Sequence, residues 1–283
     1  PSTLIDINPL PFRGIDSDGH EVRIGALTRL ADIIGDEGIQ ENFPALAQAL
    51  QETASPQVRN MATAGGNLLQ RTRCLYFRDI TVPCNKREPG SGCPALDGQN
   101  RMSAILGANQ HCIAAYAGDM ANALLALDAE LILLGPRGER RIPLEKLHRE
   151  PGDTPHIETN LQPGELIAWI VLPVSAYGRS SCYLKLRDRA TFEWALASAA
   201  AAVEITGGKI RQARIAAGGV ATRPWRLRHV ERILVGNPLD EATCVTAGEA
   251  AALGATPCPG NAFKIILLRH VVQRALLTLG GFA

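Results

Sequence analysis

Four of the seven cysteines lie close together in the sequence and could bind one inorganic group. Cys74, Cys84, Cys93 and Cys112 fall within 39 residues, with the spacing C-x9-C-x8-C-x18-C, and the other three are scattered. Four thiolates can hold either a zinc ion or an iron–sulfur cluster. Zinc sites usually contain cysteine pairs about two to four residues apart, and this loop has none, so the wide intervals favour a 4Fe–4S cluster.

The charge of the same loop agrees with a cluster. Between residues 67 and 102 there are six basic and three acidic side chains, and the resulting charge of +3 would offset a negatively charged four-thiolate cluster. Two other interpretations remain open at this point. The loop could bind zinc, or it could be a solvated basic loop whose cysteines are ordinary buried side chains. An odd number of cysteines in a long chain makes a complete disulfide framework an unsuitable alternative.

A second candidate site precedes the first of these cysteines, in the stretch 62–69. Gly65 and Gly66 let backbone N–H groups approach a phosphate or a flavin edge, and Thr63 and Asn67 offer side-chain hydrogen bonds. The stretch is neither a G-x-G-x-x-G motif nor a Walker loop. Taken alone, Gly-Gly-Asn is more often a plain turn.

The elements that must position these residues fall into two units. Leu4–Ile7 has a strand-like pattern, 27–50 is largely helical in its periodicity, and 166–172 indicates a buried strand. Residues 60–112 are rich in Gly and Pro and have almost no periodicity, which is unusual within a compact domain unless a bound group orders the loop.

Two charged residues outside the loop have ordinary interpretations when taken alone. Asp119 stands at the start of a helix predicted to end at Leu127, where it would be an N-cap, and Lys185 would be an exposed lysine on a strand.

The organisation of the sequence changes near residues 177–178. Beyond this boundary, alternating apolar residues flank a Gly207-Gly208 turn and predict a hairpin, and 230–234 and 263–279 have helical periodicity. The second unit is therefore predicted to be an α+β domain of about 100 residues.

Composition excludes several classes of protein. The 283 residues are 46% hydrophobic and 20% charged. The net charge is only +1, so the chain has no overall excess of positive charge that would attract nucleic acid or a membrane surface. No apolar run approaches the roughly 18–20 residues that cross a bilayer. The chain opens P-S-T-L without the charged and apolar regions of a signal peptide. A soluble globular protein is expected.

Together, the motifs resemble one family. The sequence NMATAGGNLLQRTRCLYFRD at 60–79, the PCNKR and GSGC segments around Cys84 and Cys93, and HCIA at 111–114 with Asp119 beyond it are similar to the FAD-binding subunits of molybdenum hydroxylases. Within that family the resemblance is to flavin subunits of bacterial aldehyde oxidoreductases of the xanthine dehydrogenase family that also carry a 4Fe–4S cluster. YLKLR at 183–187 and GGVATRPWR at 218–226 resemble the C-terminal domain of CO dehydrogenase flavoproteins.

The resemblance implies an α+β fold with two domains. Residues 1–177 are expected to form an FAD-binding domain of the PCMH/vanillyl-alcohol-oxidase-like type, with the four-Cys iron–sulfur loop at 71–112. Residues 178–283 are expected to form a CO dehydrogenase flavoprotein-type α+β domain. The family also has a preceding segment of roughly 40–50 residues with a Gly-rich loop for the FAD pyrophosphate, and we expect the native polypeptide to include it.

The resemblance also implies roles for individual residues. Cys74, Cys84, Cys93 and Cys112 are expected to ligate the 4Fe–4S cluster, so these are the metal ligands. The FAD-binding residues are expected to be Thr63, Gly65, Gly66 and Asn67 in a flavin-gripping turn, Asp119 at the sugar-like chain, Ile167 packing on the flavin or adenine, and Lys185 near the isoalloxazine. No catalytic residue that touches the substrate is expected on this chain.

The implied function is electron transfer within a complex. A large subunit would carry the molybdenum cofactor and oxidise the aldehyde, and a small subunit would carry 2Fe–2S clusters, in a heterotrimer or a dimer of heterotrimers. Electrons would pass from molybdenum through those clusters to FAD and then to an external acceptor, because flavin accepts electrons singly and can release two. No nucleic acid or membrane span is expected, and the location is cytoplasmic or periplasmic, with export only as an assembled complex on a partner's signal.

Two alternatives remain. The chain could be a non-catalytic interaction subunit of such a complex with a zinc-ordered loop. It could instead be a stand-alone flavin oxidase, but no substrate-side His/Tyr/Cys constellation supports that alternative.

Overall fold

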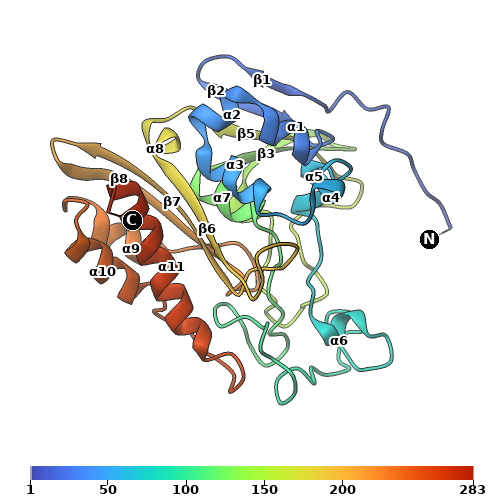
Figure 1. The fold of residues 1–283 in the computed structure, drawn as a ribbon. Helices are drawn as coiled ribbons and strands as arrows, with labels where there is room; N and C mark the ends of the chain where they lie inside the picture. The colour runs from blue at the N-terminus through green and yellow to red at the C-terminus, as the bar shows by residue number, and fades with distance from the viewer. Residues whose placement is uncertain (1, 283) are drawn as a thin grey trace.

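The computed structural model describes residues 2–282, which form two antiparallel sheets with helices around them (Figure 1). The first sheet contains β1 (Ile15–Ser17), β2 (Glu21–Gly25), β3 (Glu130–Gly135), β4 (Gly138–Pro143) and β5 (Leu166–Pro173). Its strand order is β1-β2-β5-β3-β4. The second sheet contains β6 (Ser181–Leu186), β7 (Ala197–Thr206), β8 (Lys209–Gly218) and β9 (Trp225–Arg226), in that order.

Most of the helices are short. They are α1 (Leu30–Gly35), α2 (Glu37–Asn42), α3 (Pro44–Gln51), α4 (Pro56–Arg59), α5 (Ala64–Leu68), α6 (Leu75–Arg78), α7 (Met120–Ala126), α8 (Ala176–Arg179), α9 (Arg228–Leu234), α10 (Glu241–Ala250) and α11 (Phe263–Gly280), with a 3-10 turn at Leu144–Lys146. Within the described residues, no helix is both long and apolar enough to cross a membrane.

Helices cover both faces of the second sheet. α9, α10 and α11 lie on one side, and α3, α7 and α8 lie on the other (Figure 1). The central strand β7 is buried at seven consecutive positions, and alanines fill most of them. Small side chains let helices approach both faces of the strand, which explains the Ala-rich run. The hairpin expected at Gly207-Gly208 is formed by β7 and β8, with positive φ at both glycines.

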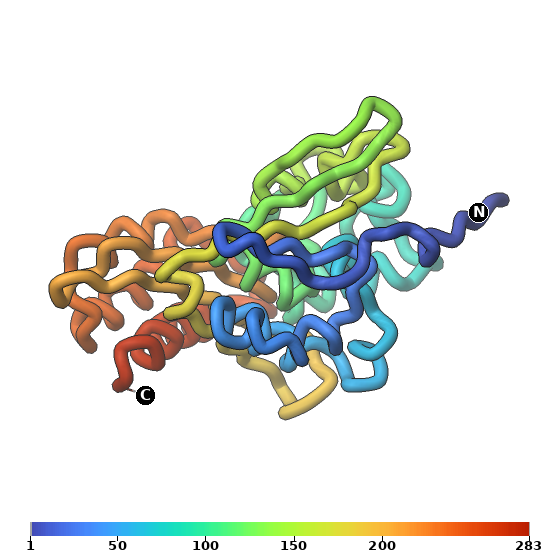
Figure 2. The backbone as a smooth tube through the Cα atoms, turned by 90° about the horizontal axis from the view of Figure 1, so that it is seen from above, coloured from blue at the N-terminus to red at the C-terminus, as the bar shows by residue number. Residues whose placement is uncertain are grey.

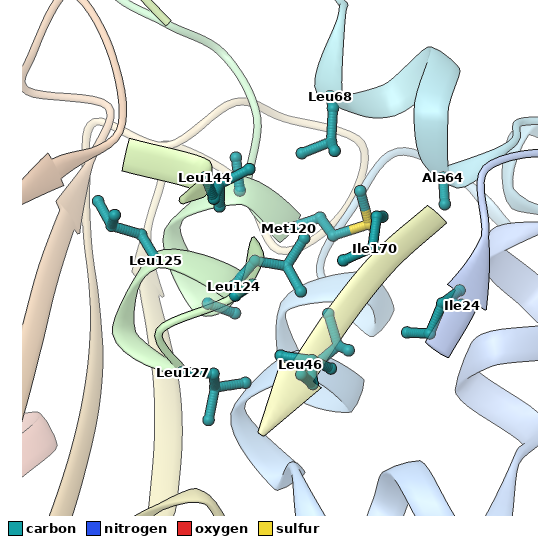
Figure 3. Close-up of a cluster of buried hydrophobic side chains, with 14 of the residues drawn as sticks. Ile24, Leu46, Ala64, Leu68, Met120, Leu124, Leu125, Leu127, Leu144 and Ile170 are labelled. Carbon is teal, nitrogen blue, oxygen red and sulfur yellow. The ribbon is translucent and has the colours of Figure 1, made fainter. Parts of the chain in front are cut away.

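A buried cluster next to the first sheet fixes the segments that carry the candidate site. Ala64 and Leu68 of α5 pack with Met120 and Leu124 of α7 and with Ile170 of β5 (Figure 3). α5 contains the Gly-Gly turn, and α7 follows Asp119 directly. The core therefore sets the relative positions of these two parts of the site.

The N-terminal residues differ from expectation. Leu4 and Ile5 are 87% and 82% exposed and form no strand, and the first strand begins at Ile15. Viewed from above, this blue segment extends away from one end of the molecule, and the orange and red C-terminal elements lie at the other end (Figure 2). An apolar run forms a strand only where a partner strand satisfies its backbone groups.

Asp128, just beyond α7, ties that helix to the second sheet. Its carboxylate accepts hydrogen bonds from Arg214 Nε at 2.6 Å, Arg226 Nη1 at 2.8 Å and the Tyr177 hydroxyl at 3.2 Å. Burial acts to raise the pKa of Asp128, but Arg226 and Arg214 outweigh it and hold that pKa below its ordinary value.

We therefore predict that Asp128→Asn lowers the free energy of unfolding by about 1–3 kcal/mol at pH 7. The folded-state pKa is depressed, so this contribution is present above the unfolded pKa of about 3.9 and is lost as pH falls through the folded value. The difference from wild type, measured by denaturant unfolding, should shrink toward pH 2. The exposed Asp153→Asn is the control, and equal stability of the two variants at pH 7 would contradict the account.

Candidate cofactor sites

The four cysteines of the 71–112 loop line one small cavity. Cys74 stands immediately before α6, and Cys84, Cys93 and Cys112 come from irregular segments. In the structure all four are free thiols, two of them buried and two partly buried. The expectation that a Gly- and Pro-rich loop could bring distant cysteines to one place therefore agrees with the geometry.

Asn85 holds three of the cysteine-bearing segments together. Its Nδ2 donates to the carbonyl of His111 at 3.0 Å, and its Oδ1 accepts from the N–H of Gly92 at 2.7 Å. These partners are the direct neighbours of Cys112 and Cys93, and Asn85 itself follows Cys84. One amide side chain thus replaces the regular hydrogen bonding that the loop lacks.

Backbone N–H groups near three of the sulfur atoms favour the thiolate form. They belong to Tyr76 and Phe77 at Cys74, to Ala95 and Ile113 at Cys93, and to Ala114 at Cys112. Burial raises the pKa of these three thiols, to about 11 for Cys112. Such N–H groups stabilise thiolates, and hydrogen bonds to sulfur are one of the factors that set the potential of iron–sulfur clusters.

The spread of the cysteines bears on the kind of group they could hold. Among the described residues, no three His, Cys, Asp or Glu side chains come close enough together to hold a single metal ion. A zinc ion needs its thiolates at about 2.3 Å from one centre. The four thiols share one cavity, and it is the wide intervals between them in the sequence that favour a body larger than one ion.

The basic residues of the loop mostly brace it. Arg71 Nε and Lys86 Nζ both contact Glu158, at 2.6 and 3.3 Å, and Lys86 also donates to the Pro155 carbonyl at 3.0 Å. Arg87 donates to the carbonyls of Tyr76, Phe77 and Val82. Of these three cations, only Lys86 lines the cysteine cavity. Only part of the positive charge of the loop therefore lies next to the cysteines.

A larger cavity of about 410 Å³ adjoins the cysteine cavity. Cys74 and Ala114 line both cavities and form a common wall. The larger cavity is lined by apolar and aromatic groups such as Trp194 and by charged residues of both signs, namely Arg73, Arg101, Asp119, Asp188 and Glu193. Its size and mixed lining are typical of sites for ligands of cofactor-ring size.

Asp119 is the centre of a buried hydrogen-bond network. Its carboxylate accepts from the Tyr183 hydroxyl at 2.6 Å, from Lys185 Nζ at 2.8 Å and from the Thr53 hydroxyl at 3.3 Å. Asp119 occupies the N-cap position of α7, but its carboxylate makes no capping hydrogen bond to that helix. Burial raises the pKa of Asp119, and Lys185, Tyr183 and Thr53 oppose that rise by favouring the charged form.

Lys185 comes from β6, far from Asp119 in sequence. Its side chain is only 1% exposed, and its Nζ also donates to the Glu52 carbonyl at 2.9 Å. The interpretation as an exposed strand lysine is therefore wrong. Sequence reasoning assigned no role to Tyr183, yet its position two residues before Lys185 on one strand places both side chains on the same face.

The Gly-Gly turn forms the short helix α5. Thr63 caps it by accepting from the N–H of Gly66 at 3.3 Å. Gly65 is closely packed, because a Cβ there would lie 3.0 Å from the Cβ of Ala26. Gly66 is exposed, and the buried Oδ1 of Asn67 has no hydrogen-bond partner among the described residues.

Of the seven expected flavin residues, only Asp119 lines the cavity of about 410 Å³. Asp119 and Lys185 contact each other, and α5 packs against α7 and β5. Ile167 is on β5 and is 5% exposed, within the hydrophobic core next to the first sheet.

Comparison with known families agrees with this arrangement. Residues 1–175 match the family described as the FAD binding domain in molybdopterin dehydrogenase, and residues 182–282 match the CO dehydrogenase flavoprotein C-terminal domain.

Individual relatives extend over nearly the whole chain. The chain is 41% identical to the aldehyde oxidoreductase FAD-binding subunit PaoB of Escherichia coli, over 98% of this chain and 84% of that protein. It is 29% identical to the carbon monoxide dehydrogenase medium chain of Hydrogenophaga pseudoflava, over 98% and 81%.

A solved structure shows the same architecture. Carbon monoxide dehydrogenase from Hydrogenophaga pseudoflava, in a form that lacks the Mo-pyranopterin moiety of its cofactor, superimposes with a TM-score of 0.73 at 27% identity, covering 98% of this chain and 82% of the other. The chain therefore belongs to the FAD-binding subunits of the molybdenum hydroxylase family, and its residues 182–282 match the CO dehydrogenase flavoprotein C-terminal domain.

Proposed function

We propose that this chain is the electron-transfer subunit of a molybdenum-dependent aldehyde oxidoreductase and that it carries both FAD and a 4Fe–4S cluster. The observation that carries the proposal is the common wall of the two cavities, where Cys74 belongs to both. A four-thiol cavity next to a cavity of cofactor size is the arrangement that two electron carriers in one chain require.

The residues fit a flavin. The cavity of about 410 Å³ has the apolar and cationic lining that suits a flavin ring, and it ends at Asp119, which can accept hydrogen bonds from the hydroxyls of a sugar-like chain. The unpartnered Oδ1 of Asn67 and the exposed Gly66 offer polar groups on α5. When bound, FAD would supply a carrier that accepts electrons singly and releases two.

Each flavin residue would have a distinct task. Thr63, Gly65, Gly66 and Asn67 would shape the gripping turn, Asp119 would orient the sugar-like chain, and Lys185 would hold the Asp119 carboxylate ionised beside the ring. Ile167, inside the core, would shape the site through β5.

For the cluster, the proposed ligands are Cys74, Cys84, Cys93 and Cys112. The support is their common cavity, the backbone N–H groups near three of the sulfurs, and the wide spacing of the cysteines in the sequence. The lack of any cysteine pair two to four residues apart disfavours the alternative of a non-catalytic subunit ordered by zinc.

The proposed partners follow from the relatives. A large molybdenum subunit would oxidise the aldehyde, and a small 2Fe–2S subunit would deliver the electrons, in a heterotrimer or a dimer of heterotrimers with an external acceptor. We place the boundary between the two domains of this chain at residues 177–178, and we place the complex in the cytoplasm or, after export on a partner's signal, in the periplasm.

Anaerobic addition of an aldehyde substrate to the oxidised complex tests this function. We expect the flavin absorbance bands to bleach, because electrons from the aldehyde reach FAD on this chain. The same preparation without the large subunit should not bleach. Stoichiometric aldehyde oxidation with a flavin that stays oxidised would contradict the proposal.

Cys93→Ser tests the cluster ligands. We expect loss of iron and of the broad iron–sulfur absorbance, together with faster proteolysis of the 71–112 loop, because metal binding supplies folding energy there. Cys258→Ser, which lies outside the cavity, should keep both properties of the wild type. Wild-type iron content and protease resistance in Cys93→Ser would rule out the assignment.

Lys185→Met tests the flavin site. The substitution leaves the Asp119 carboxylate buried without its cation, which typically costs about 3–5 kcal/mol, so we expect lower stability and reduced flavin content with iron unchanged. The double variant Asp119→Asn/Lys185→Met should recover stability but not flavin. Lys209→Met, at the exposed start of β8, is the control, and wild-type flavin content and turnover in Lys185→Met would reject the role.

A further inference from the structure

Lys264 is a lysine whose whole side chain is buried in the second domain. It lies in the first turn of α11 with 0% exposure. Its Nζ donates to the carbonyls of Met102 and Ser103, both at 3.1 Å, and to the carbonyl of Gly219 at 2.7 Å. Three acceptors match the three N–H groups that only the charged ammonium possesses.

The three residues that accept these hydrogen bonds all line the cavity of about 410 Å³. They come from two segments that are distant in sequence. Met102 and Ser103 lie between the third and fourth cysteines of the loop, and Gly219 follows β8. Gly219 has φ of +71°, and a Cβ there would lie 2.5 Å from the carbonyl oxygen of Ala195, another residue of the cavity wall. The hydrogen bonds from Lys264 and the close packing of Gly219 against Ala195 therefore both restrict this part of the cavity wall.

Neighbouring residues of the second domain secure the same segment. Asn261 Nδ2 donates to the Ser103 carbonyl at 3.2 Å, and the N–H of Gly260 donates to Asn100 Oδ1 at 3.0 Å. The guanidinium of Arg101 lies 4.7 Å from the centre of the Phe263 ring. The part of the loop between Cys93 and Cys112 is therefore attached to the start of α11.

Burying the charged ammonium of Lys264 carries a large desolvation cost. Burial, together with Arg101, lowers the pKa of Lys264 to about 7, and its three partners are neutral carbonyls. An apolar side chain of similar volume would avoid this desolvation cost. The charge that it places behind the cavity is only weakly screened there, because little water reaches it.

We propose that Lys264 is a positioning residue of the flavin cavity, which fixes three wall carbonyls and places a positive charge behind the bound ring. The proposal rests on the proposed function, in which this cavity holds the flavin ring. Reduction of the oxidised flavin by two electrons and one proton adds one negative charge, and a nearby ammonium favours that reduced form. The electrons and the proton come from the reductant and the buffer in the titration below.

The test compares Lys264→Met with Leu268→Ala in the purified FAD-containing complex. Leu268 lies one turn along α11 in the core of the second domain, so its truncation costs stability without touching the wall carbonyls. The flavin midpoint potential is measured at pH 6.5, below the pKa of Lys264. We expect the ratio of reduced to oxidised flavin at a fixed potential to fall about tenfold in Lys264→Met, a shift of about 30 mV for a two-electron couple. Leu268→Ala should keep the wild-type potential.

The outcomes separate the two proposals. An unchanged potential in folded Lys264→Met, or the same shift in Leu268→Ala, overturns the role of Lys264 and leaves the proposed function intact. A wild-type complex without flavin overturns both. If Lys264→Met does not assemble, Lys264→Gln keeps two of the three N–H donors on a shorter side chain and removes the charge, and its potential must shift in the same direction.

Discussion

The buried ion pair between Asp119 and Lys185 is the constraint on which the candidate site depends. Asp119 precedes α7 and Lys185 lies on β6, so the pair joins the two domains at 2.8 Å, with side chains only 6% and 1% exposed. A pair this deeply buried gains little net stability, because desolvation offsets the attraction. Thr53, Tyr183 and the Glu52 carbonyl supply the remaining hydrogen bonds. We interpret the pair as a device that places a carboxylate at the end of the larger cavity.

The cavities themselves are built where the loop 71–112 meets both domains. Regular secondary structure contributes little, and individual side chains replace it. Asn85 joins the segments that bear three of the cysteines. Arg87 donates hydrogen bonds to the carbonyls of two residues of α6, and Lys264 donates to the segment between Cys93 and Cys112. These residues explain how a loop without periodicity keeps a defined path, and a bound cluster would add to that order.

Much of the architecture could be predicted from local sequence. The Gly207-Gly208 hairpin, helix α11 and the irregular 60–112 region follow from periodicity and turn chemistry. The interpretation of Lys185 as an exposed lysine was wrong, and the ion pair of Asp119 was missed, because the two residues lie 66 positions apart and local pattern carries no information about such contacts. Only the resemblance to a known family implied a flavin-binding role for these two residues. Lys264 has no sequence signal at all, since a lysine within an amphipathic helix usually faces solvent.

The central claim is that one chain carries a flavin and an iron–sulfur cluster in adjoining cavities. The most direct test is an anaerobic visible absorption spectrum of the purified chain, recorded before and after dithionite, with iron and flavin assayed on the same sample. The account predicts flavin bands on a broad iron–sulfur absorbance, both bleached by the reductant. A colourless protein that contains zinc or no metal, and no flavin, would contradict it.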